Sequence, residues 1–88
     1  ARRVSRSFVV FMLANGRTGS RFGLTTSRKL GRAHERNRIR RRVREILRNA
    51  KELLPSGVDV VVNPRKSAGT RVFAELRSEL LSLLGGTD

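Results

Sequence analysis

The 88-residue chain contains no cysteine, no tryptophan and no tyrosine, and it has a single histidine. Without cysteine, neither a disulfide framework nor a thiolate metal site can form, which fits a reducing compartment. No apolar run approaches the roughly 20 residues that span a bilayer, and no signal peptide precedes the first strand-like stretch. We therefore expect one small cytoplasmic domain over residues 1–88, whose 38% apolar residues suffice for a single modest core.

Acidic residues are also scarce: seven Asp and Glu face 20 Lys and Arg, which gives a net charge of +13. Such a charge repels itself in a compact state, so we expect an acidic partner. Nucleic acid is favoured over an anionic membrane surface or a small-molecule substrate. Seventeen of the basic residues are arginine, whose planar fork suits phosphates and bases. Codon bias of a GC-rich genome would also raise the arginine share, but it would not explain the clustering.

The few acidic residues are scattered, and His34 is the only histidine. A protein nuclease acting alone needs convergent carboxylates or histidines, so this class is disfavoured. No helix-turn-helix spacing supports a DNA-binding module. We expect His34 to be a surface residue and no catalytic residue in the protein.

The hydrophobic pattern predicts three strands and two helices. Strands are expected at 8–13, at 21–27 after a hairpin with Asn15-Gly16, and at 58–62. A long helix is expected from Ala33 or His34 until Pro55-Ser56-Gly57, and a second helix from an N-cap at Thr70. Their apolar positions are Ile39, Val43, Ile46, Leu47, Ala50 and Leu54, then Val72, Phe73, Leu76, Leu80, Leu83 and Leu84. Gly85-Gly86 should end the second helix and leave 85–88 as a frayed tail.

This element order predicts an α+β fold, a small two-layer α/β sandwich with both helices packed on one face of the central sheet. If strands 21–27 and 58–62 are parallel, the helix between them is a crossover. The general rule then predicts a right-handed connection.

Residues 28–48 hold ten basic residues and only two acidic ones. At 100° per residue, an outward ridge is formed by Asn37, Arg41, Arg44 and Arg48, whereas Arg36 and Arg40 lie at the edge facing the sheet. Like charges four residues apart cost about 0.2–0.5 kcal/mol per pair, and the helix N-terminus prefers anions. A solvated helix face is the plainer interpretation, but positive side chains beside free helix N–H groups favour a phosphate site.

Residues 21–48, RFGLTTSRKLGRAHERNRIRRRVREILR, resemble the signature of the bacterial ribonuclease P protein subunit. That signature is a strand ending in G-hydrophobic-x-x-S-K/R-K-hydrophobic-G, followed by A-x-x-R-N-R-hydrophobic-K/R-R on a helix. The segments GVDVVVNPR at 57–65 and SFVVF at 7–11 fit the same family. The resemblance therefore runs over nearly the whole chain.

The resemblance implies a protein subunit of a ribozyme that removes the 5′ leader from precursor tRNA, with the catalytic RNA and Mg²⁺ supplying the chemistry. It implies that Arg36, Asn37 and Arg38 bind the catalytic RNA. Further RNA contacts are expected from Arg28, Lys29, Arg32, Arg40, Arg41, Arg44 and Arg48. A leader cleft would involve Val9, Phe11, Arg36 and Arg40. No protein metal site is certain, although the neighbourhood of Asn37 is a candidate.

The resemblance also implies a left-handed βαβ crossover, against the general rule. The family's N-terminal helix has no counterpart in the sequence, which implies a truncated start or an incomplete cleft. Phe11 is equally interpretable as an ordinary core residue. A ribosomal or other structural RNA-binding protein remains the alternative function, because composition alone fits it as well.

Overall fold

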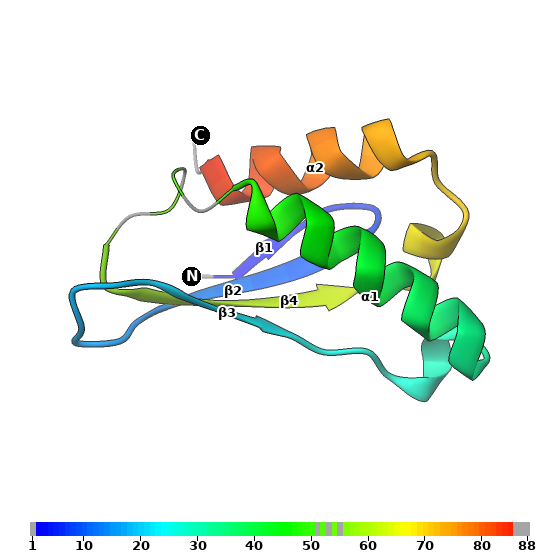
Figure 1. Ribbon diagram of the computed structural model, residues 1–88, viewed down its shortest axis with the longest axis horizontal. Helices are drawn as coiled ribbons and strands as arrows, with labels where there is room; N and C mark the ends of the chain where they lie inside the picture. Colours follow the sequence, from blue (N-terminus) through cyan, green and yellow to red (C-terminus); the bar gives the residue numbers. More distant parts are fainter. Residues whose placement is uncertain (1, 51, 53, 55, 86–88) are drawn as a thin grey trace.

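The computed structural model describes residues 2–50, 52, 54 and 56–85. Its sheet contains β1 (Arg2–Val4), β2 (Phe8–Ala14), β3 (Arg21–Leu24) and β4 (Val58–Pro64), in the order β1-β2-β4-β3. β2 is antiparallel to β1 and β4, whereas β3 is parallel to β4. Because β4 lies between β2 and β3, the hairpin expected at Asn15-Gly16 is wrong, and this segment is a loop between two strands that do not pair. Helices α1 (Ala33–Arg48) and α2 (Phe73–Gly85) lie together on one face of the sheet (Figure 1). The α+β sandwich predicted from the sequence is confirmed.

The core lies between the sheet and the two helices. Alternate residues of the central strands point toward the helices, and Phe8, Val10, Val60 and Val62 are fully buried. The helices contribute residues spaced three and four apart, which form one stripe on each helix. These are Ile39, Val43, Ile46 and Leu47 of α1 and Leu76, Leu80 and Leu84 of α2.

α1 connects β3 to β4, which are parallel neighbours in the sheet. In Figure 1, β3 lies in front of β4, both strands run to the right, and α1 returns to the left above the sheet. This path is a left-handed crossover, as the resemblance implied. The right-handed connection expected from the general rule is therefore wrong here.

Several elements differ from those predicted, and β2 and β4 extend one and two residues past their expected ends, to Ala14 and Pro64. β1 was not predicted, because its three residues are too few to show an alternating apolar pattern. β3 ends at Leu24 rather than Ser27, because Ser27 accepts a hydrogen bond from the Lys29 N–H and caps the 3₁₀ helix η1 (Arg28–Leu30). α1 ends at Arg48 although the apolar stripe continues to Leu54. Asn49 caps it by donating its side-chain N–H to the Glu45 carbonyl.

The start of the second helix is also later than predicted. The Thr70 hydroxyl donates to the Ser67 carbonyl at the end of the 3₁₀ helix η3 (Lys66–Gly69), so it is not the N-cap of α2. α2 begins at Phe73, and Val72 and Phe73 remain 64% and 36% exposed, contrary to their predicted place on the apolar face. Gly85 is the last residue of α2, and the rest of the expected frayed tail, residues 86–88, lies outside the described residues.

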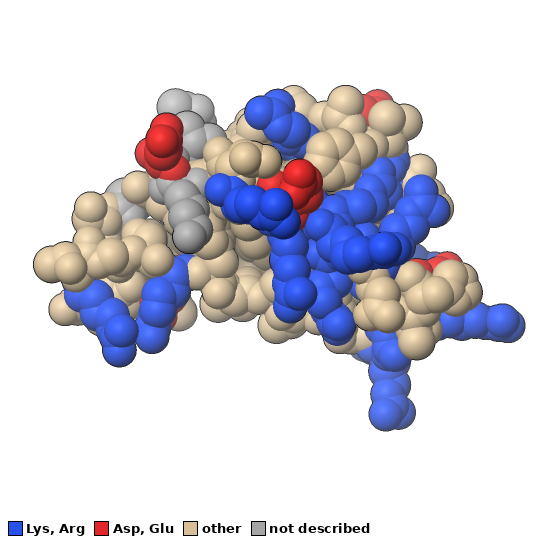
Figure 2. All heavy atoms as spheres, viewed as in Figure 1, with Lys and Arg blue, Asp and Glu red and all other residues tan. Residues whose placement is uncertain are grey.

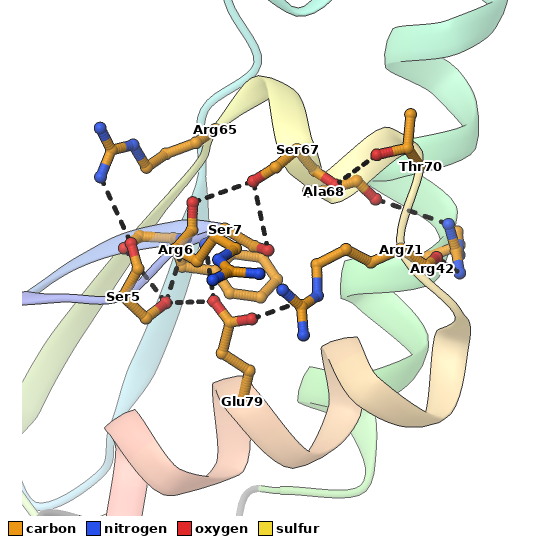
Figure 3. A network of polar contacts seen from close by, with 11 residues as sticks. Ser5, Arg6, Ser7, Arg42, Arg65, Ser67, Ala68, Thr70, Arg71 and Glu79 are labelled. Atoms are coloured by element: carbon orange, nitrogen blue, oxygen red, sulfur yellow. Dashed lines mark hydrogen bonds and ion pairs between the residues drawn. The ribbon is translucent and has the colours of Figure 1, made fainter.

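A polar network joins the β1–β2 turn to α2 and η3 (Figure 3). One Glu79 carboxylate oxygen accepts hydrogen bonds from the Ser5 hydroxyl and, at 2.6 Å, from the Ser7 N–H. The other oxygen lies 3.6 Å from Nε of Arg71, an ion pair beside the core. Ser67 donates its hydroxyl to the Arg6 carbonyl at 2.9 Å, which attaches η3 to the same turn.

Candidate nucleic-acid interface

The segment entering α1 is held so that its basic side chains face solvent. Leu30 is buried and anchors η1, while Arg28, Lys29 and Arg32 are exposed. The Glu35 carboxylate accepts a hydrogen bond from the Arg32 N–H at 2.9 Å, which fixes the first turn of α1. This hydrogen bond is the main cause that lowers the pKa of Glu35. Glu35 therefore stays ionised and serves to cap α1.

The outward ridge of α1 is exposed as the helical spacing predicts. Asn37, Arg41, Arg44 and Arg48 are all exposed, and so is Arg38 beside them. In the part of the chain that the structure describes, the one ion pair of this ridge joins Arg48 to Glu45 at 3.4 Å. Figure 2 shows the Lys and Arg side chains gathered over the half of the molecule that contains most of α1 and η1. The ridge is thus a positive surface with little internal neutralisation.

Arg36 and Arg40 lie on the sheet-facing edge of α1, and both are half-buried. One guanidinium N–H of Arg40 donates to the Thr26 hydroxyl at 2.7 Å, and another donates to the Asn37 side-chain oxygen at 3.3 Å. Arg40 therefore bridges α1 and the segment that follows β3. Thr26 was not predicted as a site residue, although its place on the face shared by Phe22 and Leu24 was a usable signal.

The sheet face that carries no helix presents the other predicted site residues. Val9 and Phe11 alternate with the buried Phe8 and Val10, so they point away from the helices and are only partly buried. Phe11 pairs with Val61 of β4 and with Arg2 of β1, and cross-strand partners share a face. This open face therefore carries an aromatic ring beside an arginine, so Phe11 is not an ordinary core residue.

Asp59 lies at one end of this open face, and its carboxylate is already satisfied. It accepts two hydrogen bonds from Arg21, at 2.9 and 2.8 Å, and one from the Asn15 amide at 2.9 Å. These bonds lower the pKa of Asp59 to about 2 and raise that of Arg21. Asp59 therefore stays ionised and forms a neutral pair with Arg21 at this end of the open face.

The predicted leader-cleft residues do not form one contiguous set of contacts. Val9 and Phe11 lie on the open face, whereas Arg36 and Arg40 belong to the helix layer. Figure 1 shows α1 slanting past the end of the sheet, so its first turns lie beside η1 at the level of the strands.

No convergent metal site is found within the described residues. No group of three or more His, Cys, Asp and Glu side chains there is arranged to hold a metal ion. Over those residues no helix is long and apolar enough to span a membrane. A metal site near Asn37 stays a prediction. The Asn37 side-chain oxygen already accepts a hydrogen bond from Arg40.

A family model described as Ribonuclease P matches residues 1–88. The chain belongs to the Ribonuclease P family. The resemblance predicted mainly from residues 21–48 is therefore confirmed.

Individual relatives agree with the family model. The ribonuclease P protein component of Streptococcus pneumoniae is 46% identical over 80 residues, which cover 91% of this chain and 65% of that protein. The chain thus spans about 65% of the length of the curated relatives that it matches.

Solved structures of the family share the fold. The RNase P protein from Thermotoga maritima, in complex with 1-(4-fluorophenyl)-2-thiourea, is 38% identical with a TM-score of 0.89. That match covers 100% of this chain and 86% of the other. The Staphylococcus aureus RNase P protein is 29% identical with a TM-score of 0.84, covering 96% and 77% of the two chains.

Two residues beside the ridge were missed as site residues by the sequence reasoning. Arg42 was not among the predicted RNA contacts and Phe73 was assigned to the apolar face of its helix, yet the Arg42 guanidinium lies 5.9 Å from the centroid of the Phe73 ring. Burial, and next the nearby charge of Arg38, lower the pKa of Arg42. The sequence did show that Arg38 and Arg42 are four residues apart, and such residues are neighbours on one side of a helix. The position of Phe73 depends on where α2 begins, which the sequence did not reveal.

Proposed function

We propose that the chain is the protein subunit of ribonuclease P. It binds the catalytic RNA through α1 and the 5′ leader of precursor tRNA across the end of the sheet. The RNA, with Mg²⁺, carries out the Mg²⁺-dependent endonucleolytic cleavage that removes the leader. The protein contributes binding and positioning, and no catalytic group of its own.

The observation that carries this proposal is the exposed arginine surface around the Arg36-Asn37-Arg38 triplet. In the described residues, Arg38, Arg41 and Arg44 have no ion pair of 4.0 Å or less, while α1 itself is anchored by its buried stripe. A protein under selection for stability alone would place acidic residues near the start of this helix. Exposed guanidinium groups on a rigid helix instead fit the phosphates of a folded RNA.

The open sheet face supports the proposal that the 5′ leader binds there. Phe11 is partly exposed, and an unpaired base stacked on an aromatic ring gains about 1–3 kcal/mol. Arg2, beside Phe11, supplies a cation for the phosphate of the same nucleotide. A leader is single-stranded RNA, whose bases are free to stack in this way.

The first test replaces Arg36 and Arg38 by Ala and measures binding to a bacterial ribonuclease P RNA at several salt concentrations. We expect weaker binding and a log–log salt slope shallower by about 0.7–0.9 for each lost phosphate contact. The circular dichroism spectrum should not change, because neither side chain belongs to the core.

The matched control removes the same charge elsewhere, by replacing the exposed Arg17 and Arg77 by Ala. We expect this variant to retain most of the affinity. Equal losses in the two double variants would show that total charge, rather than the α1 surface, accounts for binding.

A further inference from the structure

Two large apolar side chains at the start of α2 are left uncovered by the fold. Val72 and Phe73 are 64% and 36% exposed, whereas Leu76, Leu80 and Leu84 on the same helix are buried. Exposed apolar side chains that lie together mark binding surfaces more often than single ones do. Packing of the core does not explain why the Phe73 ring is exposed, whereas the α1 residues beside it suggest a binding role.

Phe73 lies in a groove between α2 and the outward side of α1. The groove has a volume of about 520 Å³ and is lined by Phe73, Arg38, Arg41, Arg42 and Glu45. The groove is shallow and mostly open to solvent. Its lining combines one aromatic ring with three guanidinium groups.

Arg42 is fixed against one face of the ring. Its guanidinium donates to the Arg71 carbonyl at 2.7 Å and to the Ala68 carbonyl at 3.5 Å, and it lies over Phe73. These contacts come from the segment that joins η3 to α2, so the guanidinium and the ring are held together from two elements. Phe73 is 36% exposed, so part of its ring is accessible to a flat ligand while Arg42 keeps its hydrogen bonds.

The groove also carries an excess of positive charge. Arg38 lies close enough to Arg42 to disfavour its charged form, and Arg38 and Arg41 are exposed. Glu45 is the acidic residue of the lining, and it pairs with Arg48 at 3.4 Å. An anionic group bound between Arg38 and Arg41 would relieve this repulsion.

We propose that this groove binds an unpaired nucleotide of an RNA strand. The base stacks on Phe73, which Arg42 supports from the other face, and the phosphate pairs with Arg38 and Arg41. The inference rests on the proposed RNA-binding function and deepens it, because it adds a subsite on the helix layer that is separate from the open sheet face. An acidic protein segment would also find cations here, but the aromatic ring supported by a guanidinium favours a base.

The test uses the absence of tryptophan and tyrosine from the chain. In the full chain, Phe73→Trp introduces a single fluorophore into the groove. We expect its emission to be quenched on titration with an eight-nucleotide oligoadenylate, and much less with a blunt RNA duplex of the same length, because paired bases are not free to stack. Adding Arg41→Ala should shift the quenching to higher RNA concentration, whereas adding Arg17→Ala should shift it little.

The second measurement is the affinity of Phe73→Leu for the same oligoadenylate. Leucine keeps the apolar surface and helix propensity but removes the ring, so we expect affinity to fall about fivefold to a hundredfold. As a control, adding Arg77→Ala to the Phe73→Trp variant should leave the quenching intact, because the exposed Arg77 does not line the groove.

Three results would overturn the proposal, and they separate it from failure of the proposed function. Unchanged emission of the introduced tryptophan at saturating RNA, or wild-type affinity of Phe73→Leu, would rule out nucleotide binding in the groove. Neither result would contradict RNA binding by the rest of the protein. A response of that tryptophan to oligoglutamate but not to oligoadenylate would assign the groove to an acidic protein partner instead. If the unmodified chain bound no RNA at all, the proposed function itself would be contradicted.

Discussion

Glu79 is the residue on which the polar network between the β1–β2 turn and α2 depends. Burial tends to raise its pKa, but the hydrogen bonds from Ser5 and Ser7, together with the charge of Arg71, lower it below the ordinary 4.5. A carboxylate with a lowered pKa in the folded state stabilises the fold above its ordinary pKa. That stabilisation is lost as the pH falls through the lowered value.

We predict that Glu79→Gln lowers the free energy of unfolding by about 1–3 kcal/mol at pH 7, because it leaves its partners poorly satisfied. The difference from the unmodified chain should shrink as the pH falls below about 4.5. Urea unfolding between pH 3 and pH 7 measures both effects. Glu75→Gln, at an exposed position of the same helix, is the control and should differ little. A loss for Glu79→Gln that stays constant down to pH 3 would contradict the role of the ionised carboxylate.

Single residues were predictable from the sequence where helical geometry alone decides their position. The 100° step placed Arg36 and Arg40 at the sheet-facing edge of α1, and Arg40 indeed contacts Thr26. The same reasoning did not place Phe73 correctly, because an apolar residue at a helix start is buried or exposed according to which turn is the first. That choice was made by Ser67 and Thr70, whose hydrogen bond ends η3.

At the scale of elements, the entry into β4 requires a glycine at position 57. Gly57 has a φ of 74°, and a Cβ there would lie 2.8 Å from the Arg17 carbonyl oxygen. Its own carbonyl accepts from the Asn15 N–H at 2.9 Å, so the β2–β3 loop and the start of β4 meet at this point. Gly16 has a similar φ of 70° but no atom within 4 Å of the same virtual Cβ.

We predict that Gly16→Ala destabilises the fold by about 1 kcal/mol, the ordinary cost of a side chain in the left-handed region. Gly57→Ala should cost about 1–3 kcal/mol more, because the carbonyl of Arg17 must also move. Thermal or urea unfolding of the two variants checks this difference. Equal stabilities would mean that the close approach of the β2–β3 loop to β4 does not constrain the fold.

The long periodic elements were predictable and the short ones were not. β2, β4 and α1 have enough residues for an apolar pattern to stand out, whereas β1 is held by pairing with β2 and by the hydrogen bond from Arg3 to the Leu83 carbonyl at 2.7 Å. That bond joins residues 80 positions apart, which no local pattern reveals. The hand of the crossover is likewise a property of the assembled sheet, and only the family resemblance predicted it.

At the scale of the whole molecule, the net charge of +13 dominates its interactions. The exposed arginines of α1 extend along one side of the fold, and the proposed function has them contact several phosphates together. We predict that the affinity for RNA falls with salt with a log–log slope of about −3 or steeper, since about 0.7 is contributed by each neutralised phosphate of single-stranded RNA. Filter binding between 50 mM and 500 mM salt measures the slope. A slope near zero would contradict the electrostatic origin of the binding.

Ribonuclease P activity gives the most direct test of the proposed function. Precursor tRNA is incubated at low Mg²⁺ with a catalytic RNA of the family, such as that of Thermotoga maritima or Streptococcus pneumoniae, with and without the protein. We predict that the protein alone leaves precursor tRNA intact, that the RNA alone is nearly inactive, and that the two together remove the 5′ leader. Arg36→Ala/Arg38→Ala should restore much less activity than Arg17→Ala/Arg77→Ala. Cleavage by the RNA-free protein, or no gain in cleavage when the protein joins the RNA, would contradict this account.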